Sequence, residues 1–239
     1  MKQIRSENFY IRITGSHALF TTPYSKGGGE AISYPIPTQQ ALIGIVDACY
    51  WKPVLKNVID EVKIINPIKT QVRGSRALLK NGKADLNYIS YLTNVEYLVK
   101  YHFEWNMARE DLANDRNMIK HTEIVKRSLK KGGRRDVFLG RRECVGFVEI
   151  IGRNEYEDAT SHYQGENLSF GIMFNSFIYP DKPGNPLIST FSDVQMKDGI
   201  VQFKKPEECT IKNELSNYTF KYPQEQKSAE EELDMYENE

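Results

Sequence analysis

The sequence predicts an α+β fold in which several strands and two amphipathic helices share the N-terminal part of the chain. Three observations support this prediction: a strand-type alternation at residues 95–105, a helical spacing of apolar residues at 42–49, and a helical pattern at 114–131 that ends in glycines. The chain has 239 residues, of which 40% are hydrophobic, so it can bury a core as one large or two small domains.

Strand and helix patterns alternate from the start of the chain. Residues 9–20 place apolar side chains at every second position, and the glycine- and proline-rich residues 21–37 then predict a loop. Thr38 is a suitable N-cap for the first helix, which carries the apolar stripe at 42–49. Residues 58–65 are rich in β-branched side chains and predict a second strand.

The strand at residues 95–105 alternates apolar and polar side chains and is the clearest in the chain. We expect the second helix to begin with Asn114 or Asp115 as its N-cap and to end at Gly132. Residues 144–151 predict a fourth strand. The resulting order, β-α-β-β-α-β, is the ferredoxin-like arrangement, which also underlies the RNA-recognition (RRM) module.

These patterns divide the chain into three predicted parts. Residues 1–152 form a ferredoxin-like (RRM-like) domain with a polar excursion at about 67–93. Residues 153–222 form a small β-rich subdomain, in which Lys197-Asp198-Gly199 predicts a hairpin turn. Residues 223–239 form an acidic tail with few apolar anchors, which we expect to be disordered.

The formal net charge of zero conceals two segments of opposite charge. Residues 116–142 carry ten basic and two acidic residues, a net charge of +8, whereas residues 223–239 carry seven acidic residues and one lysine, a net charge of −6. A basic segment of this density is typical of proteins that bind polyanions. The simpler interpretation is a solvated, charged helix face.

Several classes of protein are disfavoured by the composition. No apolar run approaches the ~20 residues needed to span a bilayer, and the N-terminus has no apolar signal core. The three cysteines, Cys49, Cys144 and Cys209, are widely spaced and are expected to be reduced, partly buried thiols. Metal-binding and Walker A motifs are missing. We therefore expect a cytoplasmic protein with no membrane partner, no metal and no cofactor.

Lys120 and His121, adjacent in the second helix, are the residues best suited to chemistry. RNA supplies its own nucleophile, the 2′-hydroxyl, so its cleavage requires a base, an acid and positive charge near the phosphorane. Histidine titrates near neutrality, and lysine supplies the fixed charge. The simpler interpretations are a helix-face histidine with a satisfied hydrogen bond and a solvated lysine, and spacing alone does not overturn them.

Two further features suit a phosphate or nucleotide ligand. Glycines 132, 133 and 140 alternate with arginines, and glycine lets the backbone approach a phosphate that arginine can hold in a fork. A salt-bridged loop is the alternative. Tyr50 continues the apolar stripe of the first helix, which predicts core packing, but its phenol could also orient a phosphate or a 2′-hydroxyl. Tyr24 and Tyr34 could stack on bases.

Three strings in the sequence together resemble a known family. They are GGGEAISYPIPTQQALIGIVDACYWKP, DRNMIKH and RSLKKGGRRDVFLGRRECVGFVE. In this order they resemble the type I-C (Dvulg subtype) member of the fifth CRISPR-associated protein family, which belongs to the repeat-associated mysterious protein (RAMP) superfamily. The similarity covers about residues 8–150 strongly and the remainder loosely.

The resemblance implies a metal-independent endoribonuclease that cuts the repeat hairpin of CRISPR precursor RNA and leaves 2′,3′-cyclic phosphate and 5′-hydroxyl ends. The enzyme then stays on the 5′ handle as a subunit of Cascade, with the backbone and large subunits as partners. Carried over by motif, the catalytic residues are Tyr50, Lys120 and His121.

The basic segment supplies the predicted RNA-binding residues: Arg116, Lys126, Arg127, Lys130, Lys131, Gly132, Gly133, Arg134, Arg135, Arg141 and Arg142. Two alternatives to an RNA-cutting enzyme remain. One is a non-catalytic subunit that holds the 5′ handle of the guide RNA, and the other is a general nucleic-acid binder that also takes duplex DNA.

Overall fold

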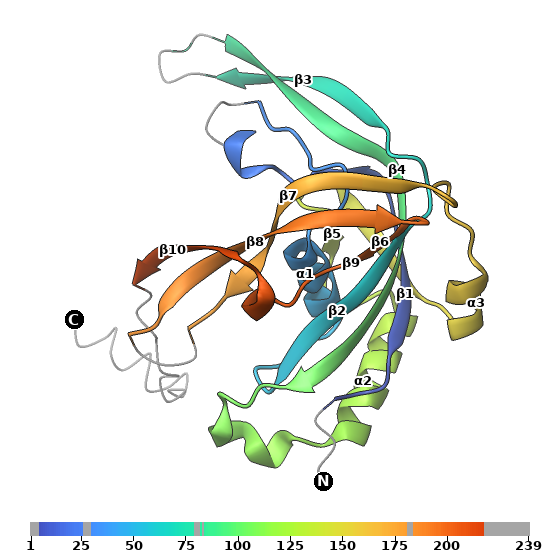
Figure 1. Cartoon of the computed structure of the whole chain (residues 1–239), viewed down its shortest axis with the longest axis vertical. Helices are drawn as coiled ribbons and strands as arrows, with labels where there is room; N and C mark the ends of the chain where they lie inside the picture. The colour runs from blue at the N-terminus through green and yellow to red at the C-terminus, as the bar shows by residue number, and fades with distance from the viewer. Residues whose placement is uncertain (1–4, 26–29, 79–81, 83, 181–183, 218–239) are drawn as a thin grey trace, which may run out of the picture.

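An antiparallel sheet forms the frame of the protein in the computed structural model, which describes residues 5–25, 30–78, 82, 84–180 and 184–217 (Figure 1). The strand order is β10-β8-β9-β2-β4-β1-β6-β5; β3 pairs with β4, and β7 with β8. Every pairing between these strands is antiparallel. The strands are β1 (Phe9–Ala18), β2 (Leu55–Ile64), β3 (Thr70–Leu78), β4 (Ala84–Trp105), β5 (Val137–Phe138), β6 (Val145–Ile150), β7 (Asn167–Ile178), β8 (Pro186–Lys197), β9 (Ile200–Gln202) and β10 (Ile211–Asn217).

Two of the helices were predicted, and one of them begins later than expected. Thr38 caps α1 by accepting a hydrogen bond from the Ala41 N–H at 3.2 Å, as predicted. The predicted cap of α2 at Asn114 or Asp115 is wrong, because those residues belong to a 3₁₀ helix and Asn117 caps α2. The helices are α1 (Gln39–Cys49), α2 (Met118–Lys130) and α3 (Arg153–Asp158), with 3₁₀ helices η1 (Pro23–Ser25), η2 (Glu110–Asp115) and η3 (Pro206–Glu208).

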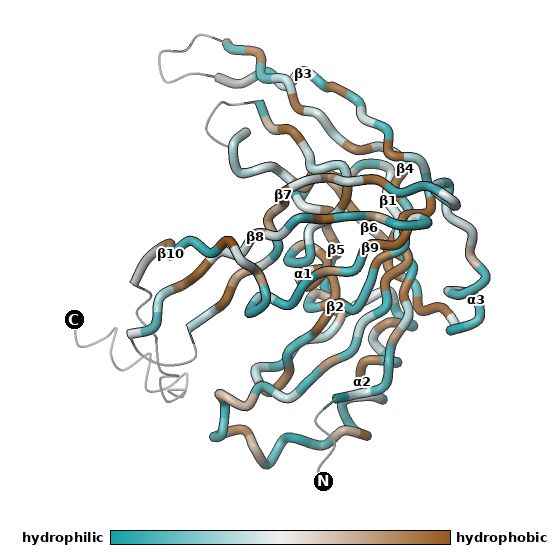
Figure 2. The backbone as a smooth tube through the Cα atoms, viewed as in Figure 1, coloured by the Kyte–Doolittle hydropathy of each residue, from teal (hydrophilic) through white to brown (hydrophobic). Residues whose placement is uncertain are grey.

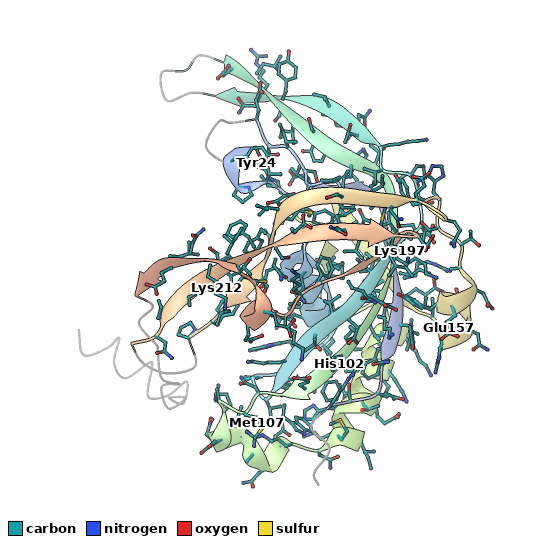
Figure 3. The ribbon with its side chains drawn as sticks, viewed as in Figure 1. Tyr24, His102, Met107, Glu157, Lys197 and Lys212 are labelled. Carbon is teal, nitrogen blue, oxygen red and sulfur yellow. The ribbon has the colours of Figure 1, made fainter. Side chains whose placement is uncertain are left out.

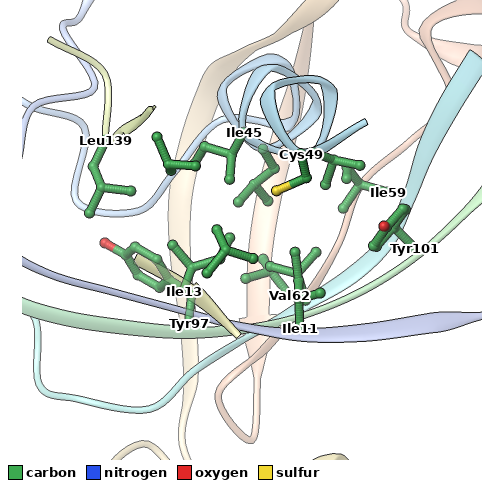
Figure 4. Packing of buried hydrophobic residues seen from close by; sticks show 14 of the residues in the cluster. Ile11, Ile13, Ile45, Cys49, Ile59, Val62, Tyr97, Tyr101 and Leu139 are labelled. Atoms are coloured by element: carbon green, nitrogen blue, oxygen red, sulfur yellow. The ribbon is translucent and has the colours of Figure 1, made fainter. Parts of the chain in front are cut away.

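The core lies between the sheet and the helices α1 and α2. Figure 4 shows Ile45 and Cys49 of α1 facing Ile11, Val62 and Tyr101 from the strands. The predicted stripe at 42–49 is buried as expected, and so are the alternate apolar residues of the segment 95–105. Figure 2 shows the same alternation as a change of hydropathy along the strands. The prediction of a fold that mixes helices and strands is confirmed, and the structure shows that the strand pairing is antiparallel.

The predicted excursion at 67–93 contains β3 and the first half of β4, which pair from Thr70↔Leu92 to Leu78↔Ala84. This hairpin extends away from the helices (Figure 1). The predicted strands after residue 152 are present as β7, β8 and β9, and β9 pairs with β2 in the same sheet. The predicted hairpin turn is confirmed, because Asp198 and Gly199 both have positive φ. The sequence did not predict α3 or β10, and the acidic tail lies outside the described residues.

Candidate active site

Tyr50 and His121 meet inside the protein, although 71 positions separate them in the chain. Tyr50 ends α1, where its backbone N–H donates to the Val46 carbonyl at 2.9 Å, and His121 lies in the first turn of α2. The Tyr50 hydroxyl oxygen lies 2.8 Å from Nδ1 of His121. Tyr50 is 3% exposed and His121 is 0% exposed. The packing of α1 beside α2 therefore joins two of the three predicted catalytic residues in a buried contact.

Both ring nitrogens of His121 have hydrogen-bond partners, and these partners fix the orientation of the ring. Nε2 lies 2.8 Å from the backbone carbonyl of Asp115, which accepts hydrogen bonds and cannot donate one. In the neutral imidazole, this acceptor places the proton on Nε2 and leaves Nδ1 to accept from the Tyr50 hydroxyl. The rings of Phe103 and Trp105 lie edge-on to the imidazole, with centroids 6.4 and 5.6 Å away. His121 is thus fixed in orientation by polar and aromatic contacts.

Lys120 precedes His121 and lies at the surface, with half of its side chain exposed. Its ammonium group forms an ion pair with the Asp115 carboxylate. This hydrogen bond raises the pKa of Lys120 and lowers the pKa of Asp115, so both groups are charged near neutral pH. Asp115 Oδ2 also lies 3.6 Å from His121 Nε2. Asp115 therefore contacts two of the predicted catalytic residues, while Lys120 keeps a positive charge close to them.

Arg134 covers the Tyr50 ring, with its guanidinium carbon 4.6 Å from the ring centroid. The last turn of α2 and the loop after it are each held by a hydrogen bond to the end of α1. The Arg135 N–H donates to the Ala48 carbonyl at 3.2 Å, and the Ser128 hydroxyl donates to the Cys49 carbonyl. Burial raises the pKa of the Tyr50 phenol, and the nearby Arg134 acts in the opposite direction.

Two of the glycines that were predicted to approach a phosphate, Gly132 and Gly140, have backbone conformations or surroundings that require glycine. Gly132 has φ +78 and follows the end of α2, as predicted. Gly140 has φ +95, and a Cβ atom there would overlap the backbone carbonyl of Leu19. No larger side chain fits at Gly140 without a backbone shift. The approach of a phosphate to these glycines remains a prediction.

The predicted RNA-binding side chains differ in what they contact. Lys126 pairs with Glu7 at 2.8 Å, and Arg141 lies 3.8 Å from Glu143. Arg116 is partly buried and donates to the Asn106 and Arg109 carbonyls, so it supports the turn before α2. The remaining side chains are exposed and make no ion pair with a described residue: Arg127, Lys130, Lys131, Arg134, Arg135 and Arg142. These six are available to an anionic ligand.

Sequence reasoning missed three residues of this site. Asp115 was named as a helix cap, and its contact with His121 had no signal in the sequence. Asn57 on β2 donates 2.8 and 3.2 Å hydrogen bonds to the Asp47 carboxylate and the Tyr50 carbonyl, which fixes the end of α1. Phe103 was predicted as a core residue of the strand, and its place beside His121 depends on how α2 packs across the sheet.

The described part of the chain contains no group of three or more His, Cys, Asp or Glu side chains arranged to hold a metal ion. None of its helices combines the length and apolar character that crossing a membrane requires. Cys49, Cys144 and Cys209 are buried and free, as predicted.

Comparisons with known proteins give a consistent family. The family model named Cas_Cas5d, described as "CRISPR-associated protein (Cas_Cas5)", matches residues 10–204. A curated relative from Mannheimia succiniciproducens, "CRISPR pre-crRNA endoribonuclease Cas5d", is 28% identical over 216 residues, which cover 80% of this chain and 92% of that protein.

Two solved structures are also similar. The first is described as a CRISPR-associated protein; it is 47% identical, covers 88% of this chain and 99% of its own, and superposes with a TM-score of 0.74. The second is a functionally uncharacterized protein from Streptococcus mutans; it is 48% identical, covers 87% of this chain and 98% of its own, and has a TM-score of 0.72. The chain is therefore similar to these proteins over nearly their whole lengths.

Proposed function

Because the chain belongs to the Cas5d family of CRISPR-associated proteins, we propose that it is an endoribonuclease that cuts precursor CRISPR RNA. The observation that carries the proposal is the buried contact between the Tyr50 hydroxyl and Nδ1 of His121, 2.8 Å apart, beside the charged Lys120. A phenol held on a base can relay a proton, and a nearby ammonium group can stabilise a phosphorane. Cleavage by a 2′-hydroxyl requires a base, an acid and positive charge near the phosphorane; the relay supplies the first two and the ammonium group the third.

The proposed mechanism assigns the contact with RNA to Tyr50 and the role of base to His121. The 2′-hydroxyl passes its proton to the Tyr50 oxygen as the Tyr50 proton moves to Nδ1 of His121. The 2′-oxygen then attacks phosphorus, and the bond from phosphorus to the 5′-oxygen breaks. The relay returns its proton to the 5′-oxygen, which leaves a 2′,3′-cyclic phosphate and a 5′-hydroxyl. Because His121 is 0% exposed, it acts through Tyr50 in this scheme.

Lys120 and Asp115 support the charges that this mechanism creates. The Lys120 ammonium stabilises the phosphorane, and the raised pKa keeps it protonated. When His121 gains a proton it carries a positive charge in a buried place, and the Asp115 carboxylate at 3.6 Å from Nε2 offsets it. Asp115 is a positioning residue in this scheme because it acts through His121 and Lys120.

Arg134 connects RNA binding to the mechanism in this proposal. Its guanidinium lies over the Tyr50 ring in the free protein. A guanidinium pairs with phosphate through two hydrogen bonds, which are stronger than an exposed cation–π contact. An RNA phosphate would therefore draw Arg134 from the ring and give the scissile nucleotide access to Tyr50.

We extend the proposal to the fold and the partners. The order β2-β4-β1-β6, with α1 and α2 on one side, supports a ferredoxin-like unit within residues 1–152, followed by a β-rich subdomain at 153–222. The exposed arginines and lysines after residue 126 support binding of the repeat hairpin. After cleavage the protein stays on the 5′ handle as a Cascade subunit beside the backbone and large subunits. Binding of duplex DNA and membership of the Dvulg subtype belong to the same proposal.

One experiment tests the proposed reaction directly. The full-length protein is incubated with a repeat hairpin RNA in EDTA, and the cut position and end groups are mapped. We expect a single cut with a 2′,3′-cyclic phosphate, and no cut when the scissile nucleotide is 2′-deoxy, although that RNA still binds. Cleavage of the 2′-deoxy RNA would exclude the mechanism, and loss of activity in EDTA would indicate a metal.

One observation favours the second candidate function, a guide-RNA subunit that does not cut. Tyr50 and His121 are both buried in the free protein, as structural core residues would be. In that case a His121→Ala variant leaves RNA binding intact, and neither it nor the wild type cuts the repeat. Cleavage by the wild type that is lost in His121→Ala supports the enzyme.

A further inference from the structure

A cavity of about 920 Å³ opens beside the N-terminal half of α1, away from the Tyr50 end of that helix. This volume is within the range of roughly 300–1,000 Å³ that is usual for small-molecule sites. Its walls come from α1, from β7 and β8, and from the chain after α2, which contributes Phe138 of β5, Gly140 and Arg141. The predicted base-stacking residue Tyr34 also lines it, and Tyr24, which is 78% exposed, follows the lining residue Pro23 (Figure 3).

One wall of the cavity is aromatic. The rings of Phe174 and Phe177 lie 4.9 Å apart at 57°, and those of Phe174 and Phe191 lie 5.7 Å apart at 70°. Residues three apart on a regular strand face opposite sides, but the register of β7 against β8 shifts between Phe174 and Phe177. The irregularity allows both rings to line the cavity. All three side chains are partly exposed, and such rings are the platforms on which proteins stack nucleobases.

Two polar side chains that line the cavity, Tyr34 and Gln40, have hydrogen-bond donors that a ligand can use. The Tyr34 hydroxyl accepts from the Phe174 N–H at 3.2 Å, and Gln40 Oε1 accepts from the Phe177 N–H at 3.1 Å. The hydroxyl proton of Tyr34 and the amide N–H groups of Gln40 have no acceptor among the described residues. Arg141 is the charged residue of the lining, in which no described residue is acidic; Glu143, 3.8 Å from the Arg141 guanidinium, lies outside the lining. The cavity therefore suits a flat ligand that has acceptor atoms and an attached negative charge.

Gly44 keeps the cavity open on the side of α1. It lies in the middle of the helix, where glycine is less favourable than alanine, and it is exposed. A Cβ atom added there would meet nothing within 4 Å, so packing does not require glycine. Because Gly44 has no side chain, the cavity stays open at this position, and this explains why a glycine lies in the helix although packing does not require one.

We propose that this cavity binds an unpaired nucleobase of the RNA substrate, a proposal that rests on the proposed function. The base stacks on the phenylalanine rings and accepts hydrogen bonds from Tyr34 and Gln40. Its phosphate lies towards Arg141. Gly44 and Tyr50 are about 9 Å apart along the helix axis, at about 1.5 Å per residue, so the base lies within a few nucleotides of the scissile phosphate.

The test uses full-length protein and a labelled repeat hairpin RNA with unpaired flanks, in which each flanking nucleotide is made abasic in turn. Affinity is measured by fluorescence anisotropy. Gly44→Leu fills the cavity at a helix position with open space, and we expect it to weaken binding roughly 5- to 150-fold, which is the effect of losing one stacked base. Gly152→Leu is the matched control, because Gly152 also has open space around it and lies outside the lining.

The proposal is decided by combining a cavity variant with each abasic RNA and comparing the losses of affinity. One abasic position should weaken wild-type binding and cause no further loss in Gly44→Leu. Phe174→Leu, which keeps apolar volume and removes the ring, should show the same pattern. If both variants bind every RNA as the wild type does, the cavity receives another ligand, such as an apolar peptide of another subunit, and the proposal is wrong. Cleavage by the wild type then still supports the enzyme, whereas a wild type that neither binds nor cuts contradicts both.

Discussion

Tyr50→Phe tests the proton relay with the smallest change that the site allows. It removes the phenol oxygen and keeps the ring beneath Arg134. The buried Nδ1 of His121 then loses its hydrogen-bond donor, and an unsatisfied buried group costs about 1–3 kcal/mol of stability. A positioned proton-transfer group contributes roughly 10²- to 10⁴-fold to a rate, which is about 3–5 kcal/mol of the activation barrier. Cleavage should therefore slow by that factor.

Single-turnover cleavage with protein in excess over a repeat hairpin RNA measures the chemical step. Anisotropy measures the RNA dissociation constant, and urea unfolding measures stability. Tyr97→Phe is the matched control, because Tyr97 is 2% exposed, compared with 3% for Tyr50, and its ring packs on Phe20. We expect the control to cut at the wild-type rate and both variants to bind RNA with wild-type affinity.

Two results would refute this reasoning. If Tyr50→Phe cuts as fast as Tyr97→Phe, the hydroxyl carries no proton in the reaction. If the rate at saturating protein is unchanged and the dissociation constant rises instead, the hydroxyl contributes to binding and the relay is wrong.

Three further predictions concern the thiols, the glycines and the basic surface. Burial raises the pKa of the Cys49 thiol to about 12, so a thiol reagent at pH 8 should not modify it until the protein unfolds. The free energy of unfolding should fall from about pH 9 towards pH 12, because over that range the thiol ionises in the unfolded chain and stays protonated in the folded one. Gly140→Ala should lower the free energy of unfolding in urea by more than about 3 kcal/mol, and Gly132→Ala by about 1–2 kcal/mol. Both positions have positive φ, but of the two only Gly140 has no space for an added Cβ. Arg142→Gln should reduce the slope of log affinity against log salt by about 0.7, whereas Arg153→Gln, paired with Glu157 on α3, should leave it unchanged.

The parts of the fold that the sequence predicted are those with a buried face. The stripe of α1 and the alternation in 95–105 both reflect one apolar side, and both are buried as expected. β10 carries exposed Ile211 and Leu215, so its pattern did not identify a strand. α3 has six residues and is held by its surroundings, because so short a helix has little stability alone.

The candidate site was predicted by residue type and by motif, and its geometry was not. Spacing favoured an inner-face histidine with a satisfied hydrogen bond at His121, and this describes the observed environment well. The contact with Tyr50 depends on the packing of α1 against α2, which no local pattern encodes. The basic segment was predicted as one surface, but Arg116 supports a turn and Lys126 is paired with Glu7.

The late start of α2 is what places the hydrogen-bond acceptor of His121 Nε2. Had the helix begun at Asn114 or Asp115, as the sequence predicted, the Asp115 carbonyl would have accepted an N–H from within the helix. Because Asn117 is the cap, Asp115 stays in the preceding turn, where its carbonyl accepts the Asn117 N–H at 2.8 Å and also faces Nε2 at 2.8 Å. That acceptor holds the proton on Nε2 and frees Nδ1 for the Tyr50 hydroxyl. An Asn117→Ala variant, which weakens the cap by about 1 kcal/mol, should therefore slow cleavage more than it weakens RNA binding.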